Sequence, residues 1–186
     1  MKSSRKLAFT IIEMLFVVSI ISIMLTLINP SLQSFLISNR VTTKLNQLVK
    51  IIHMAREAAI YKNKNTILCP SNSANNCAGE WHEGILLFTD RNDNKQRDDS
   101  EEIIFHLPSY DNEDRLYWRA FRNRKYLQMT PKGLTAWQNG TFTYCPREGL
   151  QHARGIILNA AGRIKLTKDL NGDGVHEGAN GKTIRC

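Results

Sequence analysis

Hydrophobic residues are concentrated near the start of this 186-residue chain. Residues 9–28 are almost entirely apolar, and the polar side chains that interrupt them are those of Thr10, Glu13, Ser19, Ser22 and Thr26. A helix of this length is about 30 Å long, which matches the hydrocarbon core of a bilayer. The pattern therefore predicts a transmembrane helix over residues 9–29.

The following segment, residues 30–64, has the repeat of an amphipathic helix. Its apolar residues recur at steps of three and four, and basic residues lie largely between them. The apolar positions are Leu32, Phe35, Leu36, Leu45, Leu48, Val49, Ile52, Ala55 and Ala59. We expect this segment to continue the first helix, to end in the polar run at residues 62–65, and to pack against a globular head.

The rest of the chain, residues 65–186, is rich in short β-prone runs. Turns that contain asparagine, aspartate and glycine separate these runs, which favours antiparallel strands. The predicted strands cover residues 85–88, 103–105, 116–121, 141–144, 155–158 and 163–167. The expected fold class is α+β, with one long N-terminal helix packed against a small antiparallel β-sheet head.

Residues 1–8 form a short, basic and hydroxyl-rich leader. A basic segment beside an apolar helix tends to stay in the cytoplasm, so the chain after Pro30 is expected on the other side of the membrane. An ordinary secretory signal is cut after its apolar run. Here the small residue, Ala8, precedes the run. We therefore predict cleavage between Ala8 and Phe9, which leaves the apolar segment on the mature protein.

Glu13 is the one charged residue in the apolar run. A carboxylate in a lipid-facing segment costs several kcal/mol unless it is paired or hydrated, so it indicates a function. The α-amino group that cleavage creates on Phe9 is a suitable partner, within the same helix or between neighbouring subunits. The alternative is a glutamate at the interface of an ordinary membrane helix, either neutral or extended toward the headgroups.

A processing signal is present at residues 6–15, which read KLAFTIIEML. This string resembles the processing site of type IV prepilins and type II secretion pseudopilins. The resemblance implies that a prepilin peptidase cuts before Phe9 and methylates its new amine, and that Glu13 guides filament assembly. It also implies a helix kink at Pro30, since proline removes a backbone donor. The family usually has glycine where this chain has Ala8.

Four motifs in the head form a second resemblance, at residues 81–84, 88–92, 101–104 and 159–163. Their order and spacing are similar to those of the GspH/FimT group. This implies a minor pilin that helps to prime and cap a type IV pilus, with other pilins as partners. Its helix would lie in the inner membrane and its head in the periplasm. The alternative is a minor pseudopilin of a type II secretion system, without DNA binding.

All four cysteines, Cys69, Cys77, Cys145 and Cys186, lie on the predicted exported side, where disulfides persist. Four cysteines allow three pairings. A Cys69–Cys77 bridge would close a short polar loop, and a Cys145–Cys186 bridge would attach the C-terminus to the sheet. A zinc site is the rival interpretation, but the chain has neither CxxC spacing nor a nearby CxxxH partner.

Charge is distributed unevenly in a chain of formal net charge +8. Residues 90–114 include nine acidic and three basic residues, whereas residues 115–140 include six basic residues and no acidic ones. This predicts an acidic loop region and a basic strand region. Residues 115–125 mix basic and aromatic side chains, which suits stacking on single-stranded nucleic acid. The alternative is a strand with one buried aromatic face.

A DNA-binding tail is implied by the resemblance. Some minor pilins of the FimT kind bind DNA through a Gly-Arg-x-Arg motif, and residues 162–165 read GRIK. A lysine in the last place contacts phosphate as a point charge, without bidentate geometry. The candidate phosphate contacts are Arg163, Lys165, Lys168, Lys182 and Arg185. The alternative is that they are solvated surface charges, since Asp169, Asp173 and Glu177 lie among them.

Two loops contain the oxygen-bearing residues of a calcium site. The loop that starts at Asp169 matches the first half of an EF-hand pattern, but Asn180 occupies the twelfth position, where a bidentate glutamate is expected. The loop from Asp90 to Glu101 has ligands at the right steps, but Lys95 replaces the glycine of the sharp turn. Ordinary turns use the same residues, so no metal and no cofactor is predicted.

No candidate nucleophile or general base lies in a GxSxG, HExxH or P-loop context. No catalytic residue is therefore predicted, and the protein is not expected to be an enzyme.

Overall fold

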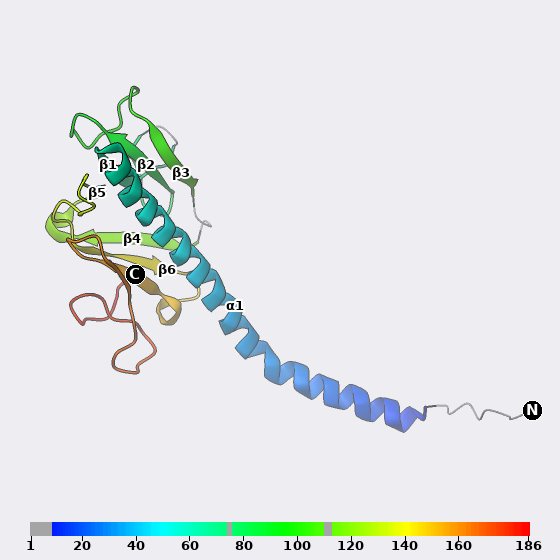
Figure 1. Cartoon of the computed structure of the whole chain (residues 1–186). Coiled ribbons are helices and arrows are strands. Elements are labelled where there is room, and N and C mark those ends of the chain that lie inside the picture. Colours follow the sequence, from blue (N-terminus) through cyan, green and yellow to red (C-terminus); the bar gives the residue numbers. More distant parts are fainter. Residues whose placement is uncertain (1–8, 74–75, 110–112) are drawn as a thin grey trace, which may run out of the picture. The chain divides into compact units, whose positions relative to one another are not determined.

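The computed structural model describes residues 9–73, 76–109 and 113–186, except for the side chains of residues 27–31. The chain forms two compact units, Met1–Asn39 and Arg40–Cys186. One helix of 52 residues, α1 (Ile11–Lys62), supplies the regular structure of the first unit and begins the second (Figure 1). The prediction of a single long N-terminal helix is confirmed. The leader, including Ala8, lies outside the described residues.

The first turn of α1 is capped by Thr10. The backbone N–H of Glu13 donates to Thr10 Oγ1 over 3.3 Å, as in a threonine N-cap. The hydroxyls of Ser19, Ser22 and Thr26 donate to backbone carbonyls about one turn back along the helix. The polar side chains of this segment, apart from Glu13, are therefore hydrogen-bonded within the helix itself.

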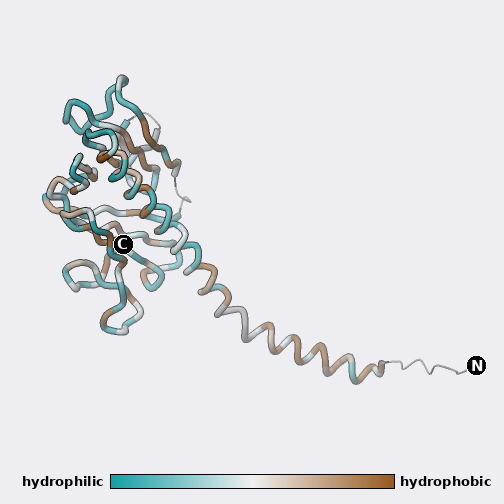
Figure 2. The backbone as a smooth tube through the Cα atoms, viewed as in Figure 1, coloured by the Kyte–Doolittle hydropathy of each residue, from teal (hydrophilic) through white to brown (hydrophobic). Residues whose placement is uncertain are grey.

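The described side chains of the first unit are mostly apolar and exposed, and Figure 2 shows this hydrophobic run along the helix. Within the described residues, no helix combines the length and the hydropathy needed to cross a bilayer. Pro30 lies within the bounds of α1, but its side chain is outside the described set. The transmembrane span and the kink at Pro30 therefore stay predictions.

The part of α1 in the second unit buries one face in the head. Its buried residues are Val41, Leu45, Leu48, Ile51, Ile52, Ala55 and Ala59. The buried hydroxyl of Thr66 donates to the carbonyl of Ala55 over 2.8 Å, which attaches the helix to the first strand. The helix ends where Asn63 adopts a φ of 51°, a left-handed conformation common at helix C-termini. The predicted amphipathic stripe is confirmed from Val41 to Ala59. The prediction is wrong for Leu32, Phe35 and Leu36, which are exposed because they precede the part of the helix that packs on the head.

The strands of the head form two antiparallel sheets. The first has the order β3-β2-β1-β5, with β1 (Asn65–Pro70), β2 (Gly84–Asp90), β3 (Ile103–Pro108) and β5 (Leu127–Met129). The second has the order β4-β6-β7-β8, with β4 (Arg115–Ala120), β6 (Gly140–Cys145), β7 (Arg154–Leu158) and β8 (Ile164–Leu166). Short 3-10 helices occupy Phe121–Asn123 and Leu150–His152. The predicted α+β class is confirmed, and the division into two sheets is new.

A cluster of aromatic rings connects the two sheets. Trp81, just before β2, meets Phe142 of β6 edge-on with ring centroids 4.9 Å apart. Trp118 of β4 stacks on the same phenyl ring at 4.2 Å. Such ring pairs add about 1 kcal/mol each to the stabilisation from buried area. The motif at residues 81–84 therefore has a packing role through Trp81. The ring of Trp118 faces the core.

A buried acidic residue connects the start of the head helix to the second sheet. The Asp114 carboxylate accepts hydrogen bonds from the Tyr144 hydroxyl and from the backbone N–H of Arg147. The guanidinium of Arg40 lies 3.5 Å from Asp114 and 2.5 Å from Glu148. The charge on Asp114 is thus balanced by donors from α1, β6 and the loop after β6, as a buried carboxylate requires.

Both disulfides form in the pairing named from the sequence. Cys69 is bonded to Cys77, and Cys145 is bonded to Cys186, so no cysteine is free. The first bridge closes the loop after β1, and the second attaches the last residue of the chain to the end of β6.

Candidate functional site

The residues after β8 pack over one face of the second sheet. Ile184 joins Cys145 and Ala153 in a small buried cluster, against which Tyr117 also packs. The Arg119 guanidinium donates to the carbonyl of Arg185 over 2.8 Å. Together with the second disulfide, these contacts hold the tail (residues 167–186) against β4, β6 and β7.

The strand register places basic residues from distant segments on the same face as the tail. Across the sheet, Arg119 pairs with Thr141, Thr141 with Ile157, and Ile157 with Lys165. Directly paired residues project on one side of an antiparallel sheet. Arg119 and Lys165 therefore lie on one face, whereas the alternate residues Leu116 and Phe142 are buried.

A groove of about 710 Å³ runs between this face and the tail. Its basic lining residues are Arg119, Lys182 and Arg185, and Phe121, which is 57% exposed, lines it as well. Two of the five candidate phosphate contacts therefore share a groove with an arginine and an aromatic ring from the basic strand region. Cationic and aromatic groups in one groove suit a strand of nucleic acid.

The other three candidate phosphate contacts lie around this groove. Arg163 is exposed and adjoins its end, because its backbone N–H donates to the side chain of Asn159, a lining residue, over 2.9 Å. Lys165 lies on the shared sheet face, one register position from Ile157. Lys168 lies in the tail, where its carbonyl accepts the backbone N–H of Glu177. None of the salt bridges within the described residues involves any of the five.

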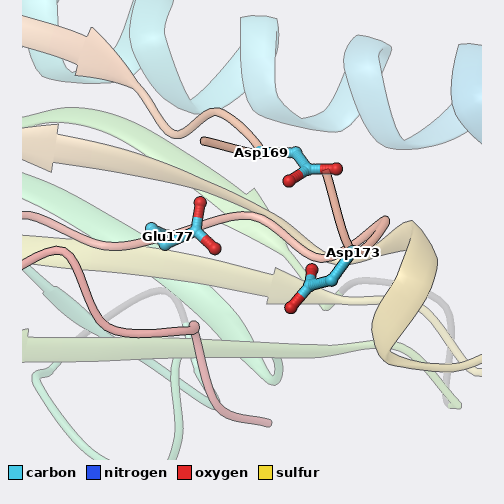
Figure 3. Close-up of side chains that lie close together, drawn as sticks. All are labelled: Asp169, Asp173 and Glu177. Atoms are coloured by element: carbon cyan, nitrogen blue, oxygen red, sulfur yellow. The ribbon is translucent and has the colours of Figure 1, made fainter. Parts of the chain in front are cut away.

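An acidic cluster lies in the tail beside these basic residues. Ligand oxygens of Asp169, Asp173 and Glu177 are all within 4.8 Å of one another (Figure 3). Backbone N–H groups of Gly174 and Gly172 hold the pKa of the Asp169 carboxyl below its ordinary value. Sequence reasoning noted the first two carboxylates as possible ligands and overlooked Glu177, although it stands at the ninth position of the loop.

The head matches a known family. The family model of the type II transport protein GspH matches residues 44–162, which is more than half of the chain. The chain belongs to the GspH family. The resemblance to the GspH/FimT minor pilin group is thereby confirmed, and the chain is placed among minor pilins and pseudopilins.

Solved structures support the same fold for this GspH-family chain. The type IV minor pilin FimU of Pseudomonas aeruginosa aligns in two crystal forms, each at 15% sequence identity. One alignment covers 70% of this chain and 90% of FimU with a TM-score of 0.53, and the other covers 68% and 92% with a TM-score of 0.51. No curated protein matches the chain.

The GspH match ends before the tail begins. It includes the aromatic cluster and the motifs around β2, but it stops at Gly162. Arg163, the acidic cluster and Cys186 therefore lie outside the matched residues. Family membership explains the scaffold of the head, whereas the tail has to be interpreted from its own residues.

The N-terminal candidates lie at the start of α1. Phe9 is 84% exposed, and Glu13 is exposed in the first turn. Most side chains from Ile11 to Leu25 are large, apolar and at least half exposed. An apolar surface of this extent is normally covered by lipid or protein.

Proposed function

We propose that this GspH-family protein is a filament subunit that is held in the inner membrane by the front of α1 before assembly. The observation that supports this most directly is the exposed apolar surface of residues 9–26, which Glu13 alone interrupts with a charge. The hydroxyls of Ser19, Ser22 and Thr26 donate to carbonyls within the helix. Such a segment suits a bilayer and, after extraction, the apolar interior of a helical filament.

In this proposal a prepilin peptidase cuts between Ala8 and Phe9, and the new amine of Phe9 is methylated. Glu13 then has a cationic partner of the right chemistry one turn away, or on the next subunit. Pairing of the two charges lowers the penalty of placing each in an apolar environment. The Glu13 carboxylate would thus select the position of the incoming subunit.

Two measurements test this proposal. Intact mass of the envelope protein should show loss of residues 1–8 and addition of one methyl group. Glu13→Val should remain in the membrane fraction, because the segment becomes more apolar, but should enter filaments at least about tenfold less often, as a lost buried charge pair predicts. Ser19→Ala is the matched control, since it removes a polar group of the same segment without a charge. A retained leader, or normal incorporation of Glu13→Val, would contradict the proposal.

The filament we propose first is a type IV pilus, in which the subunit helps to prime and cap the fibre. The alternative is the pseudopilus of a type II secretion system. Deletion of the gene separates them: loss of surface pili with normal protein secretion supports the pilus, and the reverse result supports the secretion system.

A second function, DNA binding in DNA uptake, is favoured by the groove between the second sheet and the tail. Arg119, Lys182 and Arg185 line it, and Arg163 and Lys165 lie beside it. Several cations around one groove can track a phosphate backbone, and Phe121 offers a ring for stacking. This binding would be weak, independent of sequence and sensitive to salt.

The second unit, Arg40–Cys186, is suited to the test. Its affinity for duplexes of unrelated sequence should be similar and should fall steeply with salt. Arg185→Gln and Arg163→Gln should each weaken binding to every sequence and make the salt slope about one unit shallower. Lys50→Gln is the control, because it removes one positive charge from an exposed position on α1. If all three variants behave alike, binding is diffuse electrostatics, and if wild type shows none at low salt, the DNA role is wrong.

A further inference from the structure

Three carboxylates of the tail loop converge on one another. Oxygens of Asp169, Asp173 and Glu177 lie within 4.8 Å of one another, and Figure 3 shows the three side chains around a common space. No salt bridge within the described residues involves any of them. The guanidinium of Arg154, a nearby cation, interacts electrostatically with Asp169 but donates its hydrogen bonds to the carbonyls of Gln151 and Ala153. Like charges this close repel one another unless a cation lies between them.

Glu177 adds an independent observation. The residue is only 4% exposed, and its Oε2 accepts the backbone N–H of Leu170 over 2.7 Å. Its other oxygen, Oε1, is buried and has no hydrogen-bond partner. A buried carboxylate oxygen without a donor is costly in free energy, and native proteins rarely leave one unsatisfied. Because the Glu177 carboxylate lies beside two further carboxylates, its unpartnered oxygen calls for a cation rather than a hydrogen-bond donor.

The loop backbone holds the ligands in place. The two oxygens of Asp169 accept the N–H groups of Gly172 and Gly174, over 2.7 and 2.8 Å. Asn171 Oδ1 accepts the N–H of Asp173. The two oxygens of Asp173 accept the N–H of Val175 and the side-chain amide of Asn171. These bonds use one lone pair of each oxygen and leave others for a metal. The loop is thus ordered by its own backbone before any ion binds.

We propose that Asp169, Asp173 and Glu177 bind one calcium ion, with Asn171 as a further oxygen ligand. All donors are oxygens, which hard cations prefer, and the residues stand at the first, third, fifth and ninth positions of a calcium loop. Glu177 closes this site from the ninth position, so the missing glutamate at the twelfth is not required. Calcium fits better than magnesium because a loop with three carboxylates offers many ligands without octahedral geometry.

Calcium at this site stabilises the tail. Lys168 and Thr183 both form β-bridges to Glu177, and the N–H of Ile184 donates to the carbonyl of His176. The ligands are therefore joined by backbone hydrogen bonds to the segment that contains Lys182 and Arg185. A bound ion also adds two positive charges close to the basic groove. Calcium thus stabilises the tail further and makes its surface more cationic.

The loop between β2 and β3 provides an internal comparison. There Asp98 accepts the side-chain amides of Asn92 and Asn94, and both oxygens of Glu101 accept backbone N–H groups. Asp90 retains one unpartnered buried oxygen. Within the described residues, however, three acidic ligands meet only in the tail loop. The calcium titration must therefore distinguish binding at the tail loop from binding at the loop between β2 and β3.

The test is calcium titration of the full chain in detergent, with disulfides intact and after removal of metal by a chelator. Calorimetry should give one ion per chain, with a dissociation constant on the order of 10⁻⁴ M, as in extracellular calcium modules. Calcium should also raise the unfolding temperature, by mass action. Glu177→Gln and Asp173→Asn should each weaken binding at least about tenfold, since each removes a charged ligand.

A folding defect in Glu177→Gln would also weaken calcium binding. Asp173→Asn separates the two causes, because Asp173 is exposed. Asp99→Asn is the control for net charge, since its side chain is fully exposed and lies outside both clusters of ligands. Asp98→Asn tests the other loop. Absence of calcium binding by wild type would overturn the proposal. So would binding that survives in Asp173→Asn and Glu177→Gln but is lost in Asp98→Asn.

Discussion

At the scale of single residues, the buried acids of the head differ in how their charge is balanced. Asp114 is surrounded by a guanidinium, a hydroxyl and a backbone N–H. Asp90 is also buried; one of its oxygens accepts the backbone N–H of Lys95, and the other has no hydrogen-bond partner. Loss of hydration raises the pKa of Asp90 above its ordinary value, and the nearby Glu101 carboxylate acts in the same direction. The charge on Asp90 therefore lowers the stability of the folded state.

Replacement of Asp90 should therefore stabilise the protein when divalent cations are chelated. Asp90→Asn keeps an acceptor for Lys95 and removes the buried charge, so the unfolding temperature at pH 7 should rise by about 2–4 °C, the shift that roughly 1 kcal/mol produces in a chain of this size. The pKa is higher in the folded state, so folded wild type takes up a proton and gains stability as the pH falls through that value. The difference in unfolding temperature between Asp90→Asn and wild type should therefore decrease as the pH falls through the same range. A pH series of thermal melts checks this, and a variant that is less stable at pH 7 would contradict it.

At the scale of elements, the start of β2 depends on a glycine. Gly84 has a φ of 148°, which side-chain-bearing residues rarely adopt. A Cβ there would lie 2.4 Å from the carbonyl oxygen of Ser71 and 2.9 Å from that of Leu107. Both contacts are with backbone of neighbouring segments and cannot move aside cheaply. The glycine of the motif at residues 81–84 is thus required by sheet geometry.

We expect Gly84→Ala to destabilise the head by about 2–3 kcal/mol, from backbone strain and overpacking combined. Gly178→Ala is the matched control, because its φ is not in the left-handed region and a Cβ would meet nothing closer than 3.7 Å. That variant should change stability by less than about 0.5 kcal/mol. Chemical denaturation of both variants measures the difference, and equal midpoints would show that the close contacts are relieved without cost.

At the scale of the whole molecule, the two disulfides constrain very different lengths of chain. Cys69–Cys77 spans 8 residues, and Cys145–Cys186 spans 41. In the chain-entropy description, a longer closed loop removes more freedom from the unfolded state. The second bridge also holds the tail, with its groove and its acidic cluster, against the sheet.

Loss of the longer bridge should therefore be the more damaging change. Paired serine substitution at Cys145 and Cys186 should lower the free energy of unfolding by about 4 kcal/mol, and the same change at Cys69 and Cys77 by about 2.5 kcal/mol. The first variant should also weaken calcium binding, because the tail is freed at its end. Denaturation curves of the two variants check the order, and a reversed order would show that the short loop has a packing role beyond entropy.

The sequence by itself determined the features that depend on local pattern. The apolar run and its amphipathic continuation specified one helix, and the recorded end at Lys62 lies within the predicted polar run. Most strands were recognisable because β-prone residues lie between turn residues. The exceptions were β1, which follows the helix without a turn signal, and β5, which has only three residues. Compartment predicted that the cysteines form disulfides, but four cysteines allow three pairings; the structure has the pairing that was described from the sequence.

Only the tertiary structure decided which distant residues meet. Strand order in the sheet brought Arg119 of β4 beside Lys182 and Arg185 of the tail, and no periodicity in the sequence encodes such a pairing. Folding of the tail onto the sheet buried Glu177 and turned it toward Asp169 and Asp173. Local pattern reports the conformation of neighbours along the chain. Burial and charge balance depend on long-range packing, so the groove and the acidic cluster could be recognised only in three dimensions.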